Sequence, residues 1–351
     1  MSKRILIAPL DWGLGHATRC IPIIRHIEAL GHTAVIAAEG RPLVVLQAEF
    51  PNREFIEFVG YNIRYPKGGG MAWKMGVAAP RIIKRIAAEH HELNAIIVKH
   101  SIDAVISDNR FGLYTSKVPC VYITHQVMIK APFFEPLLYQ LHMRYMNRYT
   151  EVWVPDYEVN GLSGDLGHKF PLPRNGKFIG PLSRFLPSKS QITRDILVLI
   201  SGPEPQRTRF EHVVLEHLEK FDGSAMAVLG TPELEHERTD KQGHRLVPHL
   251  PTEQMEQAIN ESELIISRSG YSTIMDLSVL GKKAVFVPTP GQTEQEYLGH
   301  IFNENRQHLL MLQRDFNLKK AWKNSENFSG FPATTSQTYK NHLERFINGL
   351  S

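Results

Sequence analysis

Short apolar runs alternate along the chain with segments of helical periodicity. Residues 4–9 and 33–38 have the length and apolar character of buried strands. Residues 18–30 between them carry apolar side chains three residues apart, a helical stripe that ends at Gly31. This strand-helix-strand order predicts a parallel sheet whose ligands bind beyond the strand ends.

The same alternation starts again in the second half of the chain. Residues 181–194 are rich in Pro, Ser and basic side chains, which is typical of a linker. A new strand is expected at residues 195–200, and further strands follow at 225–230 and 264–266. Because 351 residues are too many for one ordinary core, we expect two α/β domains.

Composition narrows the classes of partner. The chain has 40 Lys plus Arg against 36 Asp plus Glu, and its net charge of +4 is too small to indicate nucleic acid. Weak attraction to an anionic membrane surface or an anionic substrate stays open. Cys20 and Cys120 lie in apolar surroundings without the spacing of metal ligands, so we expect buried thiols in a reducing cytosol. No apolar run approaches the roughly 18 residues of a membrane span, which predicts a soluble, cytoplasmic protein.

A glycine turn follows the first strand. It contains Gly13, Gly15 and His16, but Thr18 stands where a dinucleotide fingerprint needs its third glycine. A nicotinamide cofactor is therefore disfavoured. His16 lies at a helix start, where the dipole disfavours the imidazolium, so a neutral ring can act as a base. Asp11 is a rival base, and the alternative for His16 is a side chain that caps or packs the turn.

Asp108 directly follows the buried strand predicted at residues 103–107. Its carboxylate is suited to accept the other ring proton of His16, as in bases oriented by an acid. The alternative is that Asp108 only caps the next helix.

Residues 264–297 hold the most informative stretch. A strand breaks into a turn that ends at Gly270, and a helical pattern follows. Such a turn leaves backbone N–H groups at a positive helix end, where phosphate binds. Asp276 lies six residues further on, and its carboxylate is suited to two ribose hydroxyls. The alternative is a turn that serves packing alone.

A second strand, at residues 284–287, delivers polar side chains to the same edge of the sheet. They include Gln292, Gln295 and Glu296. Amide and carboxylate groups at this place suit the hydroxyls of a sugar.

The order of residues 264–297 resembles the donor region of GT-B glycosyltransferases of family 28, especially the group that adds N-acetylglucosamine to the peptidoglycan lipid precursor. The resemblance implies that Ser269 and Gly270 face the diphosphate of a UDP-sugar and that Asp276 holds the ribose. The family's paired glutamines fall on Gln295 and Glu296, so the second is changed. Tyr271 and Gln292 complete this part of the expected donor site.

The resemblance also assigns residues elsewhere. Gly202 remains from a glycine-rich turn that approaches the donor phosphates, and Arg207 can add a positive charge. The uracil is expected near Leu250. GT-B enzymes commonly have a Gly-His pair like Gly15-His16, and in several inverting families its histidine deprotonates the acceptor hydroxyl. His125 and Gln126 match part of a His-Glu-Gln-Asn run, and they are expected on the acceptor side with Gly13 and Gly15.

Two further segments leave alternatives open. Residues 61–75 contain three consecutive glycines and are expected as a loop that either faces the acceptor or is a plain surface connection. Residues 127–149 combine aromatic and basic side chains. They indicate either an amphipathic patch that meets a membrane or a helix that faces the core.

The resulting expectation is an α/β protein with two Rossmann-like, doubly wound parallel-sheet domains facing across a cleft, the GT-B architecture. Residues 1–182 form the acceptor domain, a helix at about 335–351 crosses back to it, and residues 183–334 form the donor domain. The expected function is hexosyl transfer from a UDP-sugar to an unidentified acceptor hydroxyl, lipid-linked or small. It is expected to proceed with inversion and without metal or other cofactor, in the cell envelope pathway at the inner face of the membrane. The alternatives are a UDP-sugar 2-epimerase and a non-catalytic nucleotide-sugar binding protein.

Overall fold

The computed structural model describes residues 2–61, 71–128, 135–188, 190–234, 236–332, 334 and 337–350, with the side chains of 71–79 left out. The chain divides into two compact units. The N-terminal unit comprises Met1–Arg64, Ala72–Leu182 and Ser336–Ser351, and the C-terminal unit is built mainly from Ser183–Thr335.

The N-terminal unit contains a seven-stranded sheet in which every strand pairs in parallel with its neighbour. The strand order is β3-β2-β1-β4-β5-β6-β7. Their bounds are β1 Arg4–Pro9, β2 Thr33–Ala38, β3 Glu54–Glu57, β4 Ala104–Asp108, β5 Cys120–Ile123, β6 Glu151–Val154 and β7 Gly176–Phe178. The central strands read as continuous buried runs, because helices cover both faces of a parallel sheet.

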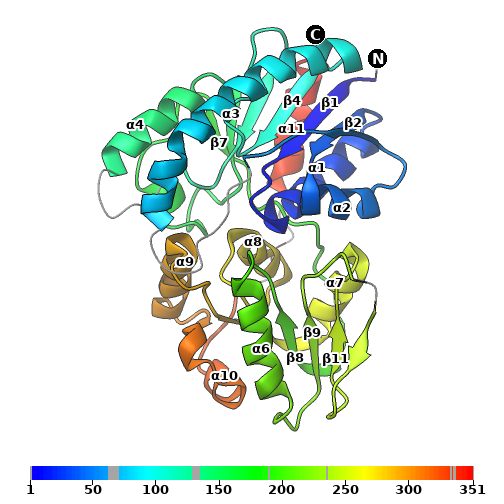
Figure 1. Ribbon diagram of the computed structural model, residues 1–351, viewed down its shortest axis with the longest axis vertical. Helices are drawn as coiled ribbons and strands as arrows, with labels where there is room; N and C mark the ends of the chain where they lie inside the picture. Colours follow the sequence, from blue (N-terminus) through cyan, green and yellow to red (C-terminus); the bar gives the residue numbers. More distant parts are fainter. Residues whose placement is uncertain are drawn as a thin grey trace. The chain divides into compact units, whose positions relative to one another are not determined.

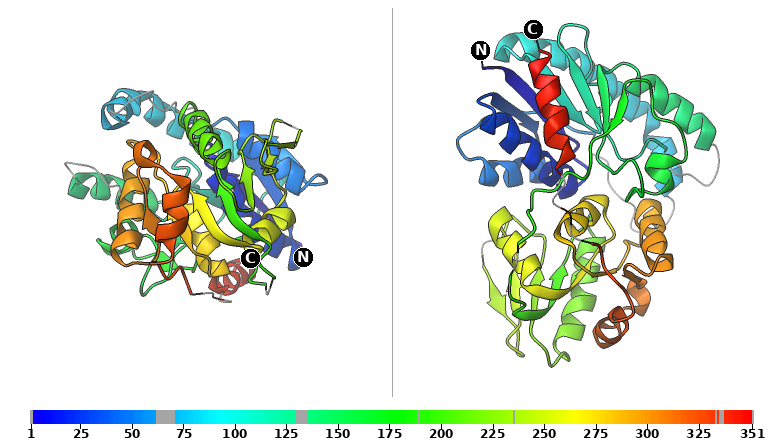
Figure 2. Two further views of the ribbon diagram at one scale, coloured as in Figure 1. Left: turned by 90° about the horizontal axis from the view of Figure 1, so that it is seen from below. Right: turned by 180° about the vertical axis from the view of Figure 1, so that it is seen from behind.

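The helices of this unit include one from the far end of the chain. They are α1 Leu14–Ala29, α2 Gly40–Glu49, α3 Met71–His100, α4 Glu135–Met146, α5 Asp165–His168 and α11 Thr338–Asn348. Figures 1 and 2 show α11, in red, beside the blue and cyan elements of this unit. The ring of Tyr339 packs edge-on against His26 of α1, and Phe346 packs against Trp153 of β6.

The C-terminal unit repeats the architecture with a second seven-stranded sheet. Its order is β10-β11-β9-β8-β12-β13-β14, parallel except for the pair β10 and β11. The strands are β8 Arg194–Leu199, β9 Ala225–Val228, β10 Arg238–Thr239, β11 Arg245–Val247, β12 Ser262–Ser267, β13 Ala284–Phe286 and β14 Leu309–Leu310. The helices are α6 Gln206–Leu218, α7 Thr252–Asn260, α8 Tyr271–Leu280, α9 Thr293–Glu304, η1 Gln313–Asp315 and α10 Leu318–Ser325.

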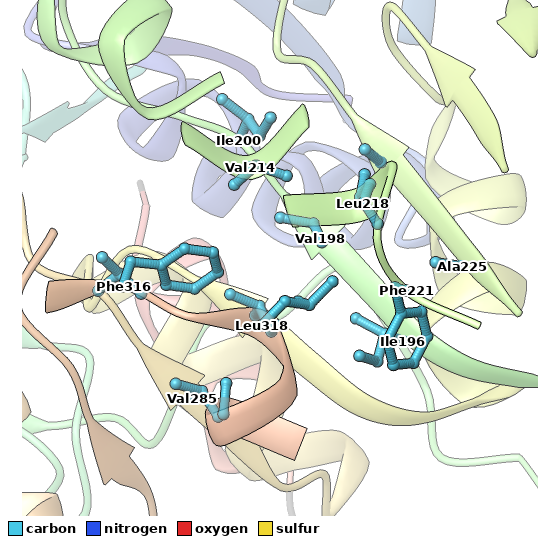
Figure 3. Packing of buried hydrophobic residues seen from close by; sticks show 14 of the residues in the cluster. Ile196, Val198, Ile200, Val214, Leu218, Phe221, Ala225, Val285, Phe316 and Leu318 are labelled. Atoms are coloured by element: carbon cyan, nitrogen blue, oxygen red, sulfur yellow. The ribbon is translucent and has the colours of Figure 1, made fainter. Parts of the chain in front are cut away.

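One core cluster of this second unit is drawn in Figure 3. Val198 of β8 and Val285 of β13 face Val214 of α6 and Leu318 of α10, and all four side chains are almost fully buried. The apolar stripe of α6 and the start of α10 therefore close the same face of the sheet. Removing such side chains from water is the main term that holds the unit together.

In both sheets the strand order reverses at one point. The reversal lies between β1 and β4 in the first sheet and between β8 and β12 in the second. In doubly wound sheets, ligands bind beyond the carboxyl ends of the strands at this switch point. His16, in the first turn of α1, and Asp108, at the end of β4, lie at the first switch point, and the turns with Gly202 and Gly270 lie at the second.

The expected elements are present, with some differences. The short helices α5 and α10 and the edge strands β10 and β14 were not predicted. Residues 62–70 of the glycine-rich segment 61–75 lie outside the described residues, and from Met71 on the expected loop is helix α3 instead.

Within the stretch 127–149, helix α4 has both buried and exposed side chains. In α4, His142 and Met146 are buried, whereas Leu137 and Leu141 are 53% and 43% exposed. Among the described residues, no helix has the length and apolarity needed to cross a membrane. Cys20 and Cys120 are buried free thiols.

Candidate functional site

The first cluster of polar side chains lies at the switch point of the N-terminal sheet. Gly13 has a φ of 131°, which a residue with a side chain rarely adopts, and it forms the N-cap of α1. His16 follows in the first turn of that helix. Asp108 ends β4, which pairs with β1 so that Pro9 and Asp108 are opposite. His16 Nδ1 lies 3.1 Å from Asp108 Oδ2, so the structure brings together the two residues that were expected to pair.

Arg19 also belongs to this cluster, although it was not among the predicted site residues. Its side chain is 2% exposed. Nε donates to Asp108 Oδ2 at 2.8 Å, and Nη2 donates to Asp108 Oδ1. Nη2 also lies 2.9 Å from His16 Nδ1, and Nη1 lies 3.2 Å from His125 Nδ1. Arg19 therefore connects the carboxylate with both histidines.

The charges of this cluster favour a neutral imidazole beside an ionised acid. Burial alone would raise the pKa of Asp108, but the charges of Arg19 and then His16 outweigh it and lower the pKa to about 2. Burial, followed by the charge of Arg19, lowers the pKa of His16 despite the opposing effect of Asp108. At neutral pH, His16 is consequently uncharged and Asp108 is ionised.

Asp108 and Arg19 have opposite effects on the tautomer of His16. When Nδ1 carries the proton, it donates to Asp108 and leaves a lone pair on Nε2. When Nδ1 is bare, it accepts from Arg19 and the proton sits on Nε2. Only the first tautomer can take a proton through Nε2, and Asp108 is the group that favours it.

Asp11 and Gln126 have different partners. Asp11 Oδ1 accepts a hydrogen bond from the backbone N–H of Tyr61 at 3.1 Å, and a Cβ on Gly60 would lie only 2.1 Å from Asp11 Cγ. The carboxylate thus fixes the loop after β3. The backbone N–H of Gln126 donates to Thr124 Oγ1 at 3.1 Å, which shapes the turn after β5.

The second candidate region is the turn between β12 and α8 in the C-terminal unit. Gly270 is the N-cap of α8, and no described side chain caps this helix end. A Cβ built on Gly270 would meet nothing within 4 Å. Tyr271, the first helical residue, is buried. The backbone at Gly270 is therefore open to the approach of a ligand.

Arg268, two residues before this N-cap, is a buried cation held only by neutral groups. The residue is 1% exposed. Its guanidinium donates to the backbone oxygens of Val287, Pro288 and Gln206 and to Gln313 Oε1, at 2.8 to 3.1 Å. Within the described parts of the chain no carboxylate pairs with it, and Nε has no partner. Burial lowers its pKa to about 9, so the group stays charged at neutral pH.

Asp276 lies on α8 and is bound to the start of the same unit. Ser183 Oγ donates to Asp276 Oδ1 at 2.6 Å. Burial raises the pKa of Asp276 to about 6, against the lowering effect of the Arg184 charge. The carboxylate is mostly ionised at pH 7 and mostly protonated at pH 5.

Four expected donor-binding side chains are engaged with their own loops instead of projecting freely. Ser269 Oγ donates to the backbone oxygen of Gln295 at 2.7 Å, so its hydroxyl ties the turn to α9. Gln295 Oε1 accepts from the N–H of Thr289 at 2.8 Å, and Glu296 Oε1 accepts from the N–H of Gly291 at 2.9 Å. Gln292 caps α9 through the N–H of Glu294. These side chains order the loop after β13.

Arg207 differs most from expectation. Its Nε donates to Glu204 at 2.6 Å and its Nη1 donates to Glu211 at 2.7 Å, so two carboxylates neutralise the guanidinium. The positive charge that was expected to face a diphosphate is therefore neutralised by Glu211 of α6 and by Glu204 of the turn before it. We therefore assign Arg207 a structural role.

The two remaining donor-side residues keep a backbone role. Gly202, with a φ of 115°, lies in the turn after β8, and its Cβ position is 3.6 Å from Thr289 Oγ1. The turns after β8 and β13 therefore approach each other there. Leu250 is buried in the loop before α7. Among the described residues, no group of three His, Cys, Asp or Glu side chains is arranged to hold a metal ion.

Comparison with known families identifies part of the chain. Residues 233–347, from the loop after β9 to α11, match the Glycosyltransferase family 28 C-terminal domain. The matched range contains the turn with Arg268 and Gly270, together with Asp276 and the loop after β13. A comparison with curated proteins finds no match.

Solved structures match over the whole chain at low sequence identity. The glycosyltransferase SnogD from Streptomyces nogalater is 15% identical with a TM-score of 0.60, and the match covers 100% of this chain and 96% of that one. MurG from Acinetobacter baumannii is 13% identical with a TM-score of 0.55 and 99% coverage of both chains. Phytolacca americana UGT2, complexed with UDP-2fluoro-glucose and pterostilbene, is 13% identical with a TM-score of 0.57, and the match covers 99% of this chain and 95% of that one.

These comparisons bear out the expected resemblance. The chain has the α/β fold of GT-B glycosyltransferases, and its C-terminal unit is similar to the family 28 domain. They also support the expected class of enzyme, a glycosyltransferase.

Proposed function

Starting from a GT-B fold whose C-terminal unit is similar to the family 28 domain, we propose that the protein transfers a sugar from a UDP-sugar to the hydroxyl of an acceptor. The observation that carries this proposal is the turn of residues 268–270. It combines a buried cation without a carboxylate partner and an open, uncapped helix N-terminus, inside the matched domain. A diphosphate supplies the negative charge that this turn lacks.

On the donor side, the diphosphate binds at Gly270, and Asp276 accepts hydrogen bonds from the ribose hydroxyls. Asp276 is ionised at neutral pH, as this contact requires. The loop after β13 contacts the sugar. The side chains of Gln295 and Glu296 accept hydrogen bonds from the backbone N–H groups of Thr289 and Gly291. To bind the sugar, they must break these bonds and contact the sugar hydroxyls instead. Otherwise the backbone of the loop makes the contacts with the sugar.

On the acceptor side, His16 is the base. Its Nε2 takes the proton of the acceptor hydroxyl while the oxygen attacks the anomeric carbon. The bond from that carbon to the diphosphate breaks, UDP leaves with the electron pair, and the configuration inverts. Asp108 stabilises the imidazolium that forms. In this scheme the turn at Gly270 stabilises the charge of the leaving UDP without a metal ion.

The acceptor and the location are proposed at a coarser level. The exposed Leu137 and Leu141 of α4 and the nearby Arg144 fit a weak peripheral contact with a membrane. A lipid-linked acceptor at the inner face of a cell membrane agrees with such a contact. A small soluble acceptor is the alternative.

A UDP-sugar 2-epimerase is the rival enzyme, because it also binds UDP-sugars. It needs acid and base side chains at the donor sugar, and the candidate Glu296 is engaged with the backbone of Gly291. The third possibility is a protein that binds a nucleotide-sugar without turnover.

The first experiment measures thermal stabilisation by a panel of nucleotides and nucleotide-sugars, including NAD. We expect selective stabilisation by UDP and one UDP-sugar, and its loss in Gly270→Asp and Asp276→Ala. Gly270 is a suitable position for this substitution, because a Cβ built there meets no described atom within 4 Å. Stabilisation by NAD, or an equal response in the variants, would contradict the donor site.

The second experiment follows the products with the selected UDP-sugar. UDP released only when an acceptor is added indicates the transferase. Isomerised sugar without UDP indicates the epimerase, and binding with neither product indicates a sensor.

A further inference from the structure

A cavity in the N-terminal unit lies apart from the candidate site. Its volume is about 540 Å³, and its lining comprises His90, Asn94, Tyr114, Thr115, Ser116, Lys117 and Arg148. These residues come from α3, from the loop between β4 and β5, and from the turn before β6.

The cavity belongs to the opposite edge of the sheet from His16 and Asp108. Asp108 is the last residue of β4, at the carboxyl edge. Lys117 comes three residues before the start of β5, and Arg148 comes three residues before the start of β6, so both approach the amino edge. A ligand in this cavity therefore cannot be the substrate that meets His16.

The lining carries positive charge without a carboxylate. Arg148 Nη1 donates to Tyr114 Oη at 2.6 Å, and its guanidinium lies over the Tyr114 ring at 5.0 Å from the centroid. In the described structure, neither the Arg148 guanidinium nor the Lys117 ammonium pairs with an acid. Both groups keep donors available for an anion.

Neutral groups of the lining complement the two cations. His90 stacks on Tyr114 with ring centroids 4.4 Å apart, and its buried Nδ1 has no partner among the described atoms. Thr115 and Ser116 add hydroxyl groups. A buried ring nitrogen without a partner is costly, so it indicates a missing polar contact.

We propose that this cavity binds an organic phosphate monoester. The phosphate pairs with Lys117 and Arg148, and the organic part fills the remaining volume beside the stacked rings of His90 and Tyr114. The same chemistry occurs in a soluble sugar or glycerol phosphate and in the headgroup of a phosphatidic acid. The site is independent of the donor site proposed above.

The test is calorimetric titration with glycerol 3-phosphate in the Gly270→Asp background, so that the proposed donor turn cannot contribute. We expect Lys117→Glu to weaken binding about tenfold or more, because it reverses one charge of a charge-assisted contact. The matched control is Lys84→Glu, the same charge change at an exposed position of α3 that does not line the cavity. Equal weakening by both variants, or no binding by the parent, would overturn the proposal.

A second arm separates the two sources of phosphate. Sedimentation with phosphatidylcholine vesicles, with and without phosphatidic acid, is measured for the same variants. Loss of vesicle binding in Lys117→Glu but not in Lys84→Glu would assign the site to a lipid headgroup. Binding of glycerol 3-phosphate without vesicle binding would assign it to a soluble ligand. Either result supports the cavity as a phosphate site.

Discussion

Arg19 and Arg268 are both buried arginines at the switch point of a doubly wound sheet, yet their charges are treated differently. Arg19 is 2% exposed and donates twice to the carboxylate of Asp108. Arg268 is 1% exposed and donates to backbone and amide oxygens, with no carboxylate partner in the described residues.

This difference in charge balance agrees with the different role proposed for each unit. In the N-terminal unit, positive and negative charge cancel within the cluster, and what remains is a neutral imidazole suited to proton transfer. In the C-terminal unit, Arg268 has only neutral partners among the described residues, so the proposed diphosphate would supply an anion that the unit itself does not. The charge of Arg19 is therefore balanced within the N-terminal unit, whereas the charge of Arg268 would be balanced only by the proposed donor.

The largest expected effect concerns the base. His16→Ala should lower kcat by about 10²- to 10⁴-fold, since it removes a general base, and leave the affinity for the UDP-sugar within about twofold. UDP release with an acceptor measures the first quantity, and calorimetric titration measures the second. Asp11→Asn is the control, because Asp11 holds the N–H of Tyr61. A larger loss of kcat in Asp11→Asn than in His16→Ala would make Asp11 the base.

The next effect tests the ion pair of Arg19 and Asp108. Arg19→Met should reduce the free energy of unfolding by about 3–5 kcal/mol, because Asp108 is left buried without its main partner. Urea denaturation measures the change. The double variant Arg19→Met, Asp108→Leu should recover part of it, since both charges are then absent. No recovery would mean that the loss comes from packing rather than from the charge of Asp108.

A smaller effect tests the charge of Arg268, which has no carboxylate partner in the described residues. Arg268→Met should weaken binding of the UDP-sugar by about 10- to 100-fold, the range of a charge-assisted interaction. Arg268→Lys keeps the charge and should retain more of the affinity. If the two variants bind equally, the charge of Arg268 does not serve the donor, and the contrast with Arg19 is one of packing alone.

The smallest effect is a pH dependence. The pKa of Asp276 is about 6, above its usual value of 3.8, so the carboxylate is protonated as pH falls through 6. Affinity for the UDP-sugar should then fall about tenfold between pH 7 and pH 5, because the protonated acid accepts ribose hydroxyls poorly. The diphosphate of a UDP-sugar does not titrate in this range. Asp276→Asn should bind weakly at both pH values, and a parallel pH profile in that variant would remove Asp276 from the effect.

Local patterns made much of the fold predictable. Apolar runs of strand length and helical stripes between them identified the central strands of both sheets, and the turns with Gly13, Gly202 and Gly270 lie where the pattern placed them. The edge strands β10 and β14 have only two residues each, too few for a pattern to show. The pair of His16 and Asp108 was predictable because both residues follow neighbouring strand ends.

Other parts of the site depend on distant contacts that a sequence does not display. Arg19 meets Asp108 across 89 positions, although its place three residues after His16 puts both on one helix face. The hydroxyl of Ser269 is used by Gln295, 26 positions away. The pairing of Arg207 was visible in principle, since Glu204 and Glu211 stand at helical spacing from it.

Helix α11 makes the N-terminal unit discontinuous along the chain. His26 of α1 lies 2.9 Å from Glu344 of α11, and Thr338 donates to the backbone oxygen of Ile179 at 2.6 Å. During synthesis on a ribosome, α1 therefore lacks its contact with α11 until residues 338–348 have been synthesised, which happens after residues 183–335. The unit that is synthesised first is the last to be completed, and its exposed α1 face is the surface that a nascent chain has to protect from aggregation.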